Sequence, residues 1–233
     1  MEKKLYDKEL GTITLRKSPR AKRCSIRIEN GNLVAVMPEN GKEETVWELI
    51  HAFRDKIRHS LRKAAPPRPL LDDTCELQTH TFKLHIFRTD RDGMYMNLRE
   101  GILHIACPLH TDFRNEQTQH ILKALVERAL RHEAQRVLPP RLAALASQYG
   151  FSYAGMQINN AKSRWGSCNI KRHINLSLSL MLLPKHLMDY VLLHELCHTV
   201  EMNHSERFWE LMNRVTANRA LLLRQELKSY RML

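Results

Sequence analysis

The stretch His194-Glu195-Leu196-Cys197-His198, followed by His204, decides how the rest of the sequence is interpreted. A helix turns by about 100° per residue, so the first and last residues of the pentapeptide lie on nearly the same side, one turn apart. Their two imidazoles can therefore bind one metal ion. Glu195 lies beside that ion without reaching it, which is the position of a general base for a metal-bound water.

His204 separates this pattern from coincidence. The chain contains 13 His, and independent draws would give the pentapeptide pattern in ~5 % of chains of this composition. Requiring a third His at the spacing of three-histidine zinc sites lowers that fraction to ~0.3 %. We therefore expect His194, His198 and His204 to bind Zn²⁺ with an open fourth position, and Glu195 to be catalytic.

The helix that carries the motif is expected to begin at Pro184 and to run to about Met202. Its face away from the metal should be buried, and that face consists of Leu192, Leu193, Leu196 and Val200. No glycine follows His198, so Asn203 is the candidate for a left-handed turn back towards the metal. Ser205 then suits the N-cap of a further helix.

The loop 161–168 precedes a predicted strand at 173–178 and supplies candidates for substrate binding. Arg164 is the first candidate for stabilising the oxyanion, and Ser167 is the second. The alternative for Arg164 is a structural ion pair with Asp189. Both Trp165 and Trp209 are expected in the core.

Composition limits the class of protein. The five Cys are odd in number, scattered and without a C-x-x-C pair, which argues for reduced thiols and against a cysteine-built zinc finger. The charged start 1–11 has no apolar core, and no later run approaches the roughly 20 apolar residues that cross a bilayer. We therefore expect a cytoplasmic protein without a membrane partner.

The net charge of +12 is concentrated at the two ends of the chain. Residues 1–72 contain 16 Lys and Arg against 10 Asp and Glu, and residues 139–233 contain 12 against 6. Basic ends favour nonspecific contact with nucleic acid, weakened by salt, although plain solubility explains them equally well.

The pattern of strands and turns predicts an α+β fold. Hairpin strands at 25–29 and 33–37 precede a helix over 43–63 and a proline-rich linker near 66–69. A second hairpin turns at Glu100-Gly101, 70 positions after the first, which indicates a duplicated strand-strand-helix unit.

A helix over 112–137 follows the second hairpin and is expected to stop at Pro139-Pro140. The predicted division is a β-rich N-terminal region with one helix over 1–110 and a second domain over 111–233 that carries the metal site.

Several motifs together resemble the YgjP family of metal-dependent hydrolases, which is related to SprT-like and other minimal zinc peptidases. They are Arg164-Trp165-Gly166-Ser167-Cys168, Asp189-Tyr190-Val191, the His194–His198 pentapeptide, Asn203-His204-Ser205, Phe208-Trp209, and Arg20-Ala21-Lys22-Arg23 with Ser25-Ile26-Arg27. The resemblance implies a minimal zincin-like α+β metallopeptidase domain with three His ligands and Glu195 as the base. Ser177 departs from it, because tryptophan is expected there, and the pocket wall should differ accordingly.

The leading hypothesis is a zinc metallopeptidase that acts on proteins or peptides, including proteins associated with nucleic acid, through a zinc-bound water activated by Glu195. One alternative is a metal-dependent nucleotide phosphoanhydride hydrolase, although no G-x-x-x-x-G-K loop is present to hold phosphates. The other is a nucleic-acid-binding protein with a structural zinc, which an open fourth position would contradict.

Overall fold

The computed structural model describes residues 2–29, 32–63 and 70–232. Contacts divide the chain into two units, Met1–Pro69 and Leu70–Leu233. The boundary predicted at 110/111 therefore differs from the observed one, because the strands after residue 70 share a hydrophobic core with the long helix that follows them. The linker expected near 66–69 lies outside the described residues.

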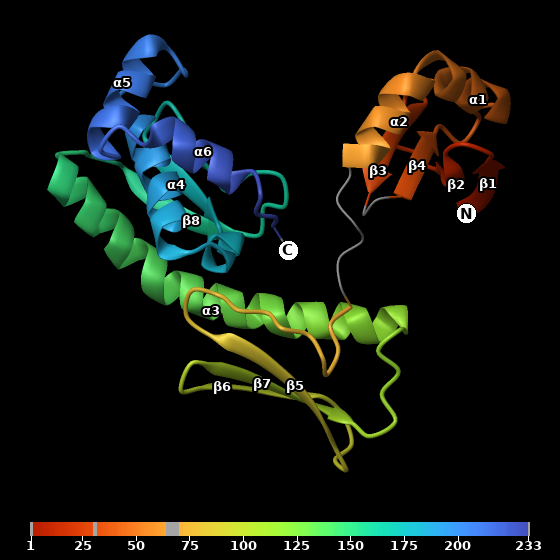
Figure 1. The fold of residues 1–233 in the computed structure, drawn as a ribbon, viewed down its shortest axis with the longest axis horizontal. Coiled ribbons are helices and arrows are strands. Elements are labelled where there is room, and N and C mark those ends of the chain that lie inside the picture. Colours follow the sequence, from red (N-terminus) through yellow and green to blue (C-terminus); the bar gives the residue numbers. More distant parts are fainter. Residues whose placement is uncertain (1, 30–31, 64–69, 233) are drawn as a thin grey trace. The chain divides into compact units, whose positions relative to one another are not determined.

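The N-terminal unit is a four-stranded sheet with two helices, shown in red to orange in Figure 1. The strands lie in the order β1 (Glu2–Asp7), β2 (Gly11–Lys17), β4 (Asn32–Met37), β3 (Ser25–Glu29). The helix predicted over 43–63 is two helices, α1 (Glu43–Ala52) and α2 (Arg54–Lys63), separated at Phe53. The sequence did not predict β1, because most of its residues are charged and a single buried apolar residue, Leu5, gives no alternating pattern.

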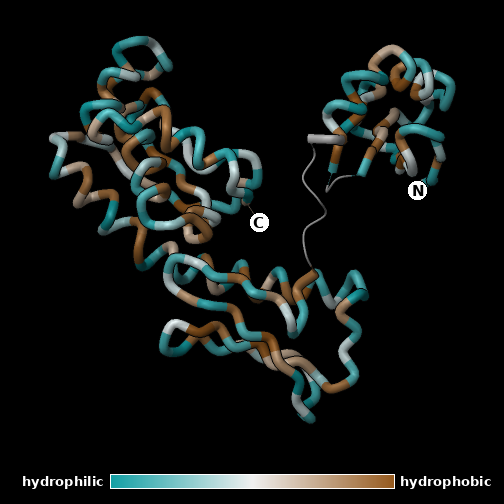
Figure 2. The backbone as a smooth tube through the Cα atoms, in the orientation of Figure 1, coloured by the Kyte–Doolittle hydropathy of each residue, from teal (hydrophilic) through white to brown (hydrophobic). Residues whose placement is uncertain are grey.

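The second unit is built around the 34-residue helix α3 (Glu116–Tyr149), shown in green in Figure 1. The sheet of β5 (Lys83–Thr89), β7 (Ile102–Pro108) and β6 (Tyr95–Arg99) contributes Leu84, Ile86, Leu103 and Ile105 to the core that this helix also lines. Figure 2 shows hydrophobic stretches along these strands. Glu100 and Gly101 have φ of 52° and 74°, so the predicted hairpin turn is confirmed.

Helix α3 continues through Pro139 and Pro140, where the sequence predicted that it would stop. A proline inside a helix costs about 3 kcal/mol, because it removes a hydrogen bond and crowds the preceding turn. Leu138, Leu142 and Leu145 on either side of the pair are buried in the same core. Burial of such side chains contributes roughly 1.5–3 kcal/mol each, so packing offsets the local penalty.

The remaining elements surround the predicted metal site. The sheet of β8 (Gly155–Asn159), β10 (His173–Ser177) and β9 (Gly166–Cys168) leads into the 3₁₀ helix η1 (Leu178–Leu182). Helices α4 (Lys185–Cys197), α5 (Glu206–Val215) and α6 (Ala220–Leu227) complete the unit. In the described parts of the chain, no helix combines the length and apolar character needed to cross a membrane.

The three-stranded arrangement occurs three times. In β2–β3–β4, β5–β6–β7 and β8–β9–β10, the first strand is parallel to the third and the second is antiparallel to it. The hairpin pairs Ser25↔Val36 and Tyr95↔Ala106 are related by a shift of 70 positions. The predicted strand-strand-helix repeat is therefore present, and a third sheet of the same topology lies beside the helix that carries the metal motif.

Candidate metal centre and active site

Helix α4 is a buried element that carries the motif on one face. Leu192 and Leu196 are fully buried, while His194 lies in the last turn and His198 is the C-cap residue. The helix ends at Cys197, earlier than the predicted Met202. Val200 is consequently 61 % exposed rather than buried, because it lies beyond the helix.

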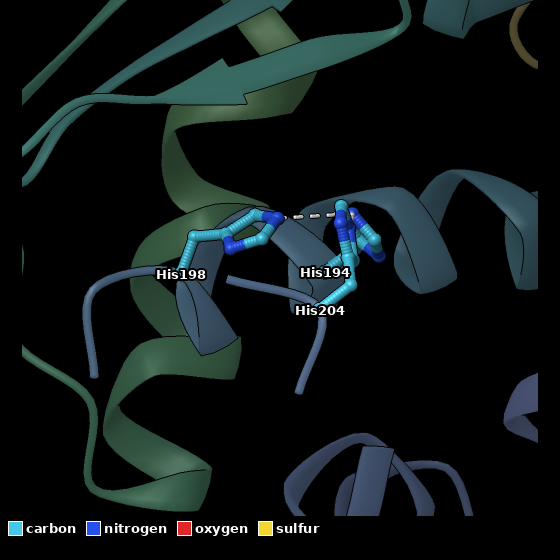
Figure 3. Close-up of side chains that lie close together, drawn as sticks. All are labelled: His194, His198 and His204. Carbon is cyan, nitrogen blue, oxygen red and sulfur yellow. Dashed lines mark hydrogen bonds between the residues drawn. The ribbon is translucent and has the colours of Figure 1, made fainter. Parts of the chain in front are cut away.

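The structure brings the three predicted histidines together, as Figure 3 shows. Nε2 of His194 lies 3.2 Å from Nε2 of His198 and 3.1 Å from Nε2 of His204. One ring nitrogen of each residue lies within 4.8 Å of the others, and among the described residues this is the group that could hold a metal ion. Neither Glu201 nor Glu210 is part of this group.

The turn between His198 and His204 is held by hydrogen bonds rather than by a left-handed residue. The Nδ1–H of His198 donates to the carbonyl oxygen of Glu201 at 3.0 Å, and the Thr199 hydroxyl donates to the Leu196 carbonyl at 2.7 Å. Asn203 does not have the positive φ predicted for it. The bond to Glu201 also fixes the His198 tautomer, so that the Nε2 lone pair faces its partners.

Helix α5 returns the chain under the site. The predicted N-cap Ser205 is confirmed, since its hydroxyl accepts a bond from the Phe208 backbone N–H. The fully buried Phe208 ring has its centroid 5.0 Å, 4.6 Å and 4.8 Å from the rings of His194, His198 and His204. This one aromatic side chain therefore supports all three imidazoles.

Burial keeps the helical histidines neutral. Burial is the main cause that lowers the pKa of His194 to about 3, and the neighbouring His198 and His204 contribute to the same lowering. Burial also lowers the pKa of His198, against the opposing effect of its bond to the Glu201 carbonyl. Neutral imidazole is the form that binds metal, so both rings are in the ligand state at neutral pH.

Glu195 is 4 % exposed, and its Oε2 has no hydrogen-bond partner among the described residues. Burial raises the pKa of its carboxyl to about 8, and the positive charge of Arg164 partly opposes the rise. A Cβ on Gly166 of β9 would lie 2.6 Å from Glu195 Oε1. The glycine therefore provides the space in which this carboxylate is held.

A cavity of about 310 Å³ lies beside the histidines and Glu195. Its aromatic wall consists of Trp165, Tyr190 and Trp209, and its cationic residues are Arg164 and Arg224. The Arg224 guanidinium lies 5.1 Å from the ring centroid of Trp209, which itself stacks on His204. Trp165 and Trp209 were predicted to be core residues; both are half-buried and pack against the hydrophobic core, and both also line this cavity.

The two residues predicted to bind substrate have different positions. Arg164 lines the cavity, and its charge acts on Glu195. Asp189, the alternative ion-pair partner predicted for Arg164, is instead paired with Arg141 through two bonds of 2.6 Å and 2.7 Å. Ser167 is not among the residues that line the cavity. Side chains alternate along β9, and its neighbours Gly166 and Cys168 are the ones close to Glu195.

Ser177 anchors the loop that carries Arg164. Its hydroxyl donates to the Ala161 carbonyl at 2.9 Å and accepts from the Ser179 N–H, and its own N–H donates to the Trp165 carbonyl at 2.8 Å. It is 1 % exposed and is not among the cavity-lining residues. The serine found here in place of the expected tryptophan therefore affects how the loop is held and does not form part of the pocket wall.

Sequence reasoning missed three parts of the site. Gly166 is part of the Arg164–Cys168 motif, and a glycine there is a signal for close approach of another element, here Glu195 of α4. Tyr190 also precedes the motif by one helical turn, the spacing that places it beside His194. Arg224 gave no local signal, because only the folding of α6 against α4 brings it to the cavity.

A comparison with curated proteins finds no match for the chain. A solved structure, the metallopeptidase zymogen of Pyrococcus abyssi abylysin, is similar at 22 % identity with a TM-score of 0.36, covering 40 % of this chain and 97 % of that one. The family model described as YgjP-like, metallopeptidase domain, matches residues 22–230. The match spans nearly the whole sequence, and the chain belongs to the YgjP-like metallopeptidase family.

Proposed function

We propose that this metallopeptidase uses zinc, held by His194, His198 and His204, with Glu195 as its general base. The observation that carries the proposal is the convergence of three Nε2 atoms beside a buried carboxylate that lacks a partner. Zinc with Zn–N bonds of about 2.0–2.1 Å and tetrahedral geometry needs ligand nitrogens about 3.3–3.4 Å apart. The separations of 3.1 Å and 3.2 Å from Nε2 of His194 are within a few tenths of an ångström of that value, and the ligand nitrogens of all three histidines lie within 4.8 Å of one another.

The bound metal would supply a Lewis acid that polarises the attacking water and the scissile carbonyl. The positive charge of the metal would favour the ionised form of Glu195. In that form Glu195 accepts the proton of that water at Oε2 and delivers it to the nitrogen of the leaving amine. Gly166 leaves room for the carboxyl group, and the neutral imidazoles of His194 and His198 leave Glu195 as the acid–base group of the site. Arg164 faces the same cavity and stabilises the oxyanion that develops on the substrate carbonyl.

The substrate is proposed to bind as an extended peptide along β9. This strand is at the edge of its sheet, and its residue Gly166 lines the cavity. An edge strand offers backbone donors and acceptors to a peptide that pairs with it. The aromatic wall of Trp165, Tyr190 and Trp209 would then receive a substrate side chain.

The cellular setting is inferred from composition. All five cysteines are free, which supports a reducing compartment such as the cytoplasm. The basic ends of the chain favour substrates associated with nucleic acid, through attraction that salt would weaken. Protease assays on a DNA-bound protein and on the same protein without DNA, at low and high salt, would measure this contribution.

Metal analysis combined with turnover tests the site. The purified protein should contain about one zinc per chain, and His194→Ala should lose it. Glu195→Gln should retain zinc and lose peptide hydrolysis by on the order of 10²–10⁴-fold, because the base is removed while the ligands stay. Casein, a peptide library and nucleoside triphosphates should be assayed in parallel. Zinc retained by His194→Ala would disprove the ligand assignment, and hydrolysis of nucleotides alone would favour a phosphoanhydride hydrolase.

A further inference from the structure

The N-terminal unit contains a groove of about 490 Å³ that the metal-site chemistry does not use. One wall is strand β3, four of whose consecutive residues line the groove, and the other wall comes from helices α1 and α2. The lining residues are Ser25, Ile26, Arg27, Ile28, Leu33, Leu49, Phe53, Lys56, Ile57 and Ser60.

Strand β3 is an edge strand. It pairs with β4 on one side and is last in the order β1-β2-β4-β3. Alternate residues of such a strand direct their N–H and C=O groups away from the sheet, where another extended chain can pair with them. An edge strand beside a helix, with a groove between them, is the arrangement in which peptide-binding domains add a peptide as a further strand.

The groove also offers apolar contacts to side chains. Phe53 is 50 % exposed, although it lies between two helices whose other large apolar residues are mostly covered. Leu49 and Ile28 are half-buried beside it. An exposed apolar surface next to a free strand edge suits alternate side chains of an extended peptide, since every second side chain would point into the groove.

The charge of the groove selects the kind of peptide. Arg27 and Lys56 are exposed at its walls, and none of the residues that line it is acidic. Exposed Arg20, Lys22 and Arg23 immediately precede β3. An acidic segment would be attracted to this surface, whereas a basic one would be repelled.

We propose that the N-terminal unit binds an extended acidic peptide segment, which pairs with the free edge of β3 and places alternate apolar side chains against Phe53 and Leu49. This is a recognition site on a different unit from the three histidines, and it does not depend on metal. Nucleic acid is the rival polyanion. Nucleic acid would be attracted to the cationic side chains but would not form the backbone hydrogen bonds that the free edge of β3 offers to a peptide.

The test is fluorescence polarisation with the full chain in a Glu195→Gln background, so that the probe is not cleaved. The probe is a labelled ten-residue peptide in which valine alternates with glutamate. Three further probes are the same peptide with lysine in place of glutamate, the acidic peptide with alternate backbone amides N-methylated, and a labelled single-stranded oligonucleotide. N-methylation removes hydrogen-bond donors and leaves the charge unchanged.

Reversal of the groove charges should change binding selectively. Arg27→Glu combined with Lys56→Glu should weaken binding of the acidic peptide by about tenfold or more. Lys4→Glu on β1, at the opposite edge of the sheet, is the matched control and should have little effect. Thermal unfolding of each variant should show that the N-terminal unit remains folded.

The outcomes separate this inference from the proposed catalytic function. We expect the acidic peptide to bind, the lysine and N-methylated peptides to bind at least about tenfold more weakly, and His194→Ala to bind like the parent. Binding that survives N-methylation, binding equally sensitive to Lys4→Glu, absence of binding by the acidic peptide, or binding confined to the oligonucleotide would overturn the proposal. Each of these results can be obtained whether or not the metal site hydrolyses peptides.

Discussion

At the scale of single residues, the site depends on a close approach between a strand and a helix. Glu195 is buried without a hydrogen-bond partner for Oε2, and the space for its carboxylate exists because residue 166 has no side chain. Burial without a partner disfavours the charged form of a carboxyl group, and the raised pKa of Glu195 reflects this cost. The three imidazoles are held separately, by Phe208 and by the bond from His198 to Glu201.

Gly166→Ala should therefore reduce hydrolysis without removing the metal. The new Cβ would lie 2.6 Å from Oε1 of Glu195 and would displace that carboxylate, whereas the histidines would stay in place. We expect kcat to fall by on the order of 10²-fold, because small displacements of a catalytic group have effects of that size. Turnover and zinc content of the same preparation measure the two effects. Ser167→Ala in the same strand should remain close to the parent, and an equal loss there would identify Ser167 as a catalytic donor.

At the scale of elements, the loop 161–165 is attached to the sheet through Ser177. This one residue caps η1 and bonds to the carbonyl of Ala161, and its backbone bonds to that of Trp165. Arg164, the proposed oxyanion residue, lies between those two attachment points. The precision of the cavity wall therefore depends on a serine that does not line the cavity.

Ser177→Ala tests this attachment. The substitution removes the helix cap and one bond to the loop, which should destabilise the second unit by about 1–2 kcal/mol. KM for peptides should rise as the loop loosens, while zinc content is unchanged. Ser179→Ala is the matched control, since Ser179 is equally buried and its hydroxyl has no partner among the described residues. Chemical denaturation and peptide kinetics of the two variants should differ; equal behaviour would contradict the role of Ser177.

At the scale of the whole molecule, one three-stranded topology is used in three contexts. The first two sheets contribute apolar side chains to the cores of their units, and the third sheet contains β9, which lies beside the site. The N-terminal unit has its own core and its own partly buried ion pair. There Asp7 accepts two bonds from the Arg54 guanidinium, at 2.7 Å and 3.2 Å.

Acid should unfold the N-terminal unit through Asp7. The bond from Arg54 is the main cause that lowers the pKa of Asp7 from 3.8 to about 2. The folded pKa lies below the unfolded one, so this stabilisation is fully present above pH 3.8 and is lost as the pH falls towards 2. Fluorescence of Trp47 in a Trp165→Phe, Trp209→Phe background would follow urea unfolding of this unit. Asp7→Asn should flatten the dependence in that range, and the exposed Glu9→Gln should not. A dependence that survives in Asp7→Asn would assign it to another group.

The sequence by itself determined the features that depend on local spacing. The positions of His194, Glu195 and His198 follow from the period of a helix, the turn at 100–101 follows from Gly101, which tolerates positive φ, and Ser205 follows from capping chemistry. The similarity between the two hairpins was also visible as a shift of 70 positions.

The tertiary structure decided what depends on packing between distant segments. Helix α3 continues past Pro139 and Pro140, because the burial of apolar side chains on both sides of the pair offsets the lost hydrogen bonds. The boundary between units lies at 69/70, because β5–β7 share a core with α3. The cavity beside the histidines also depends on tertiary packing, since its lining residues Gly166, Trp209 and Arg224 lie on three separate elements. No local pattern in the chain encodes contacts between such elements, since they arise from how the apolar faces of the elements pack together.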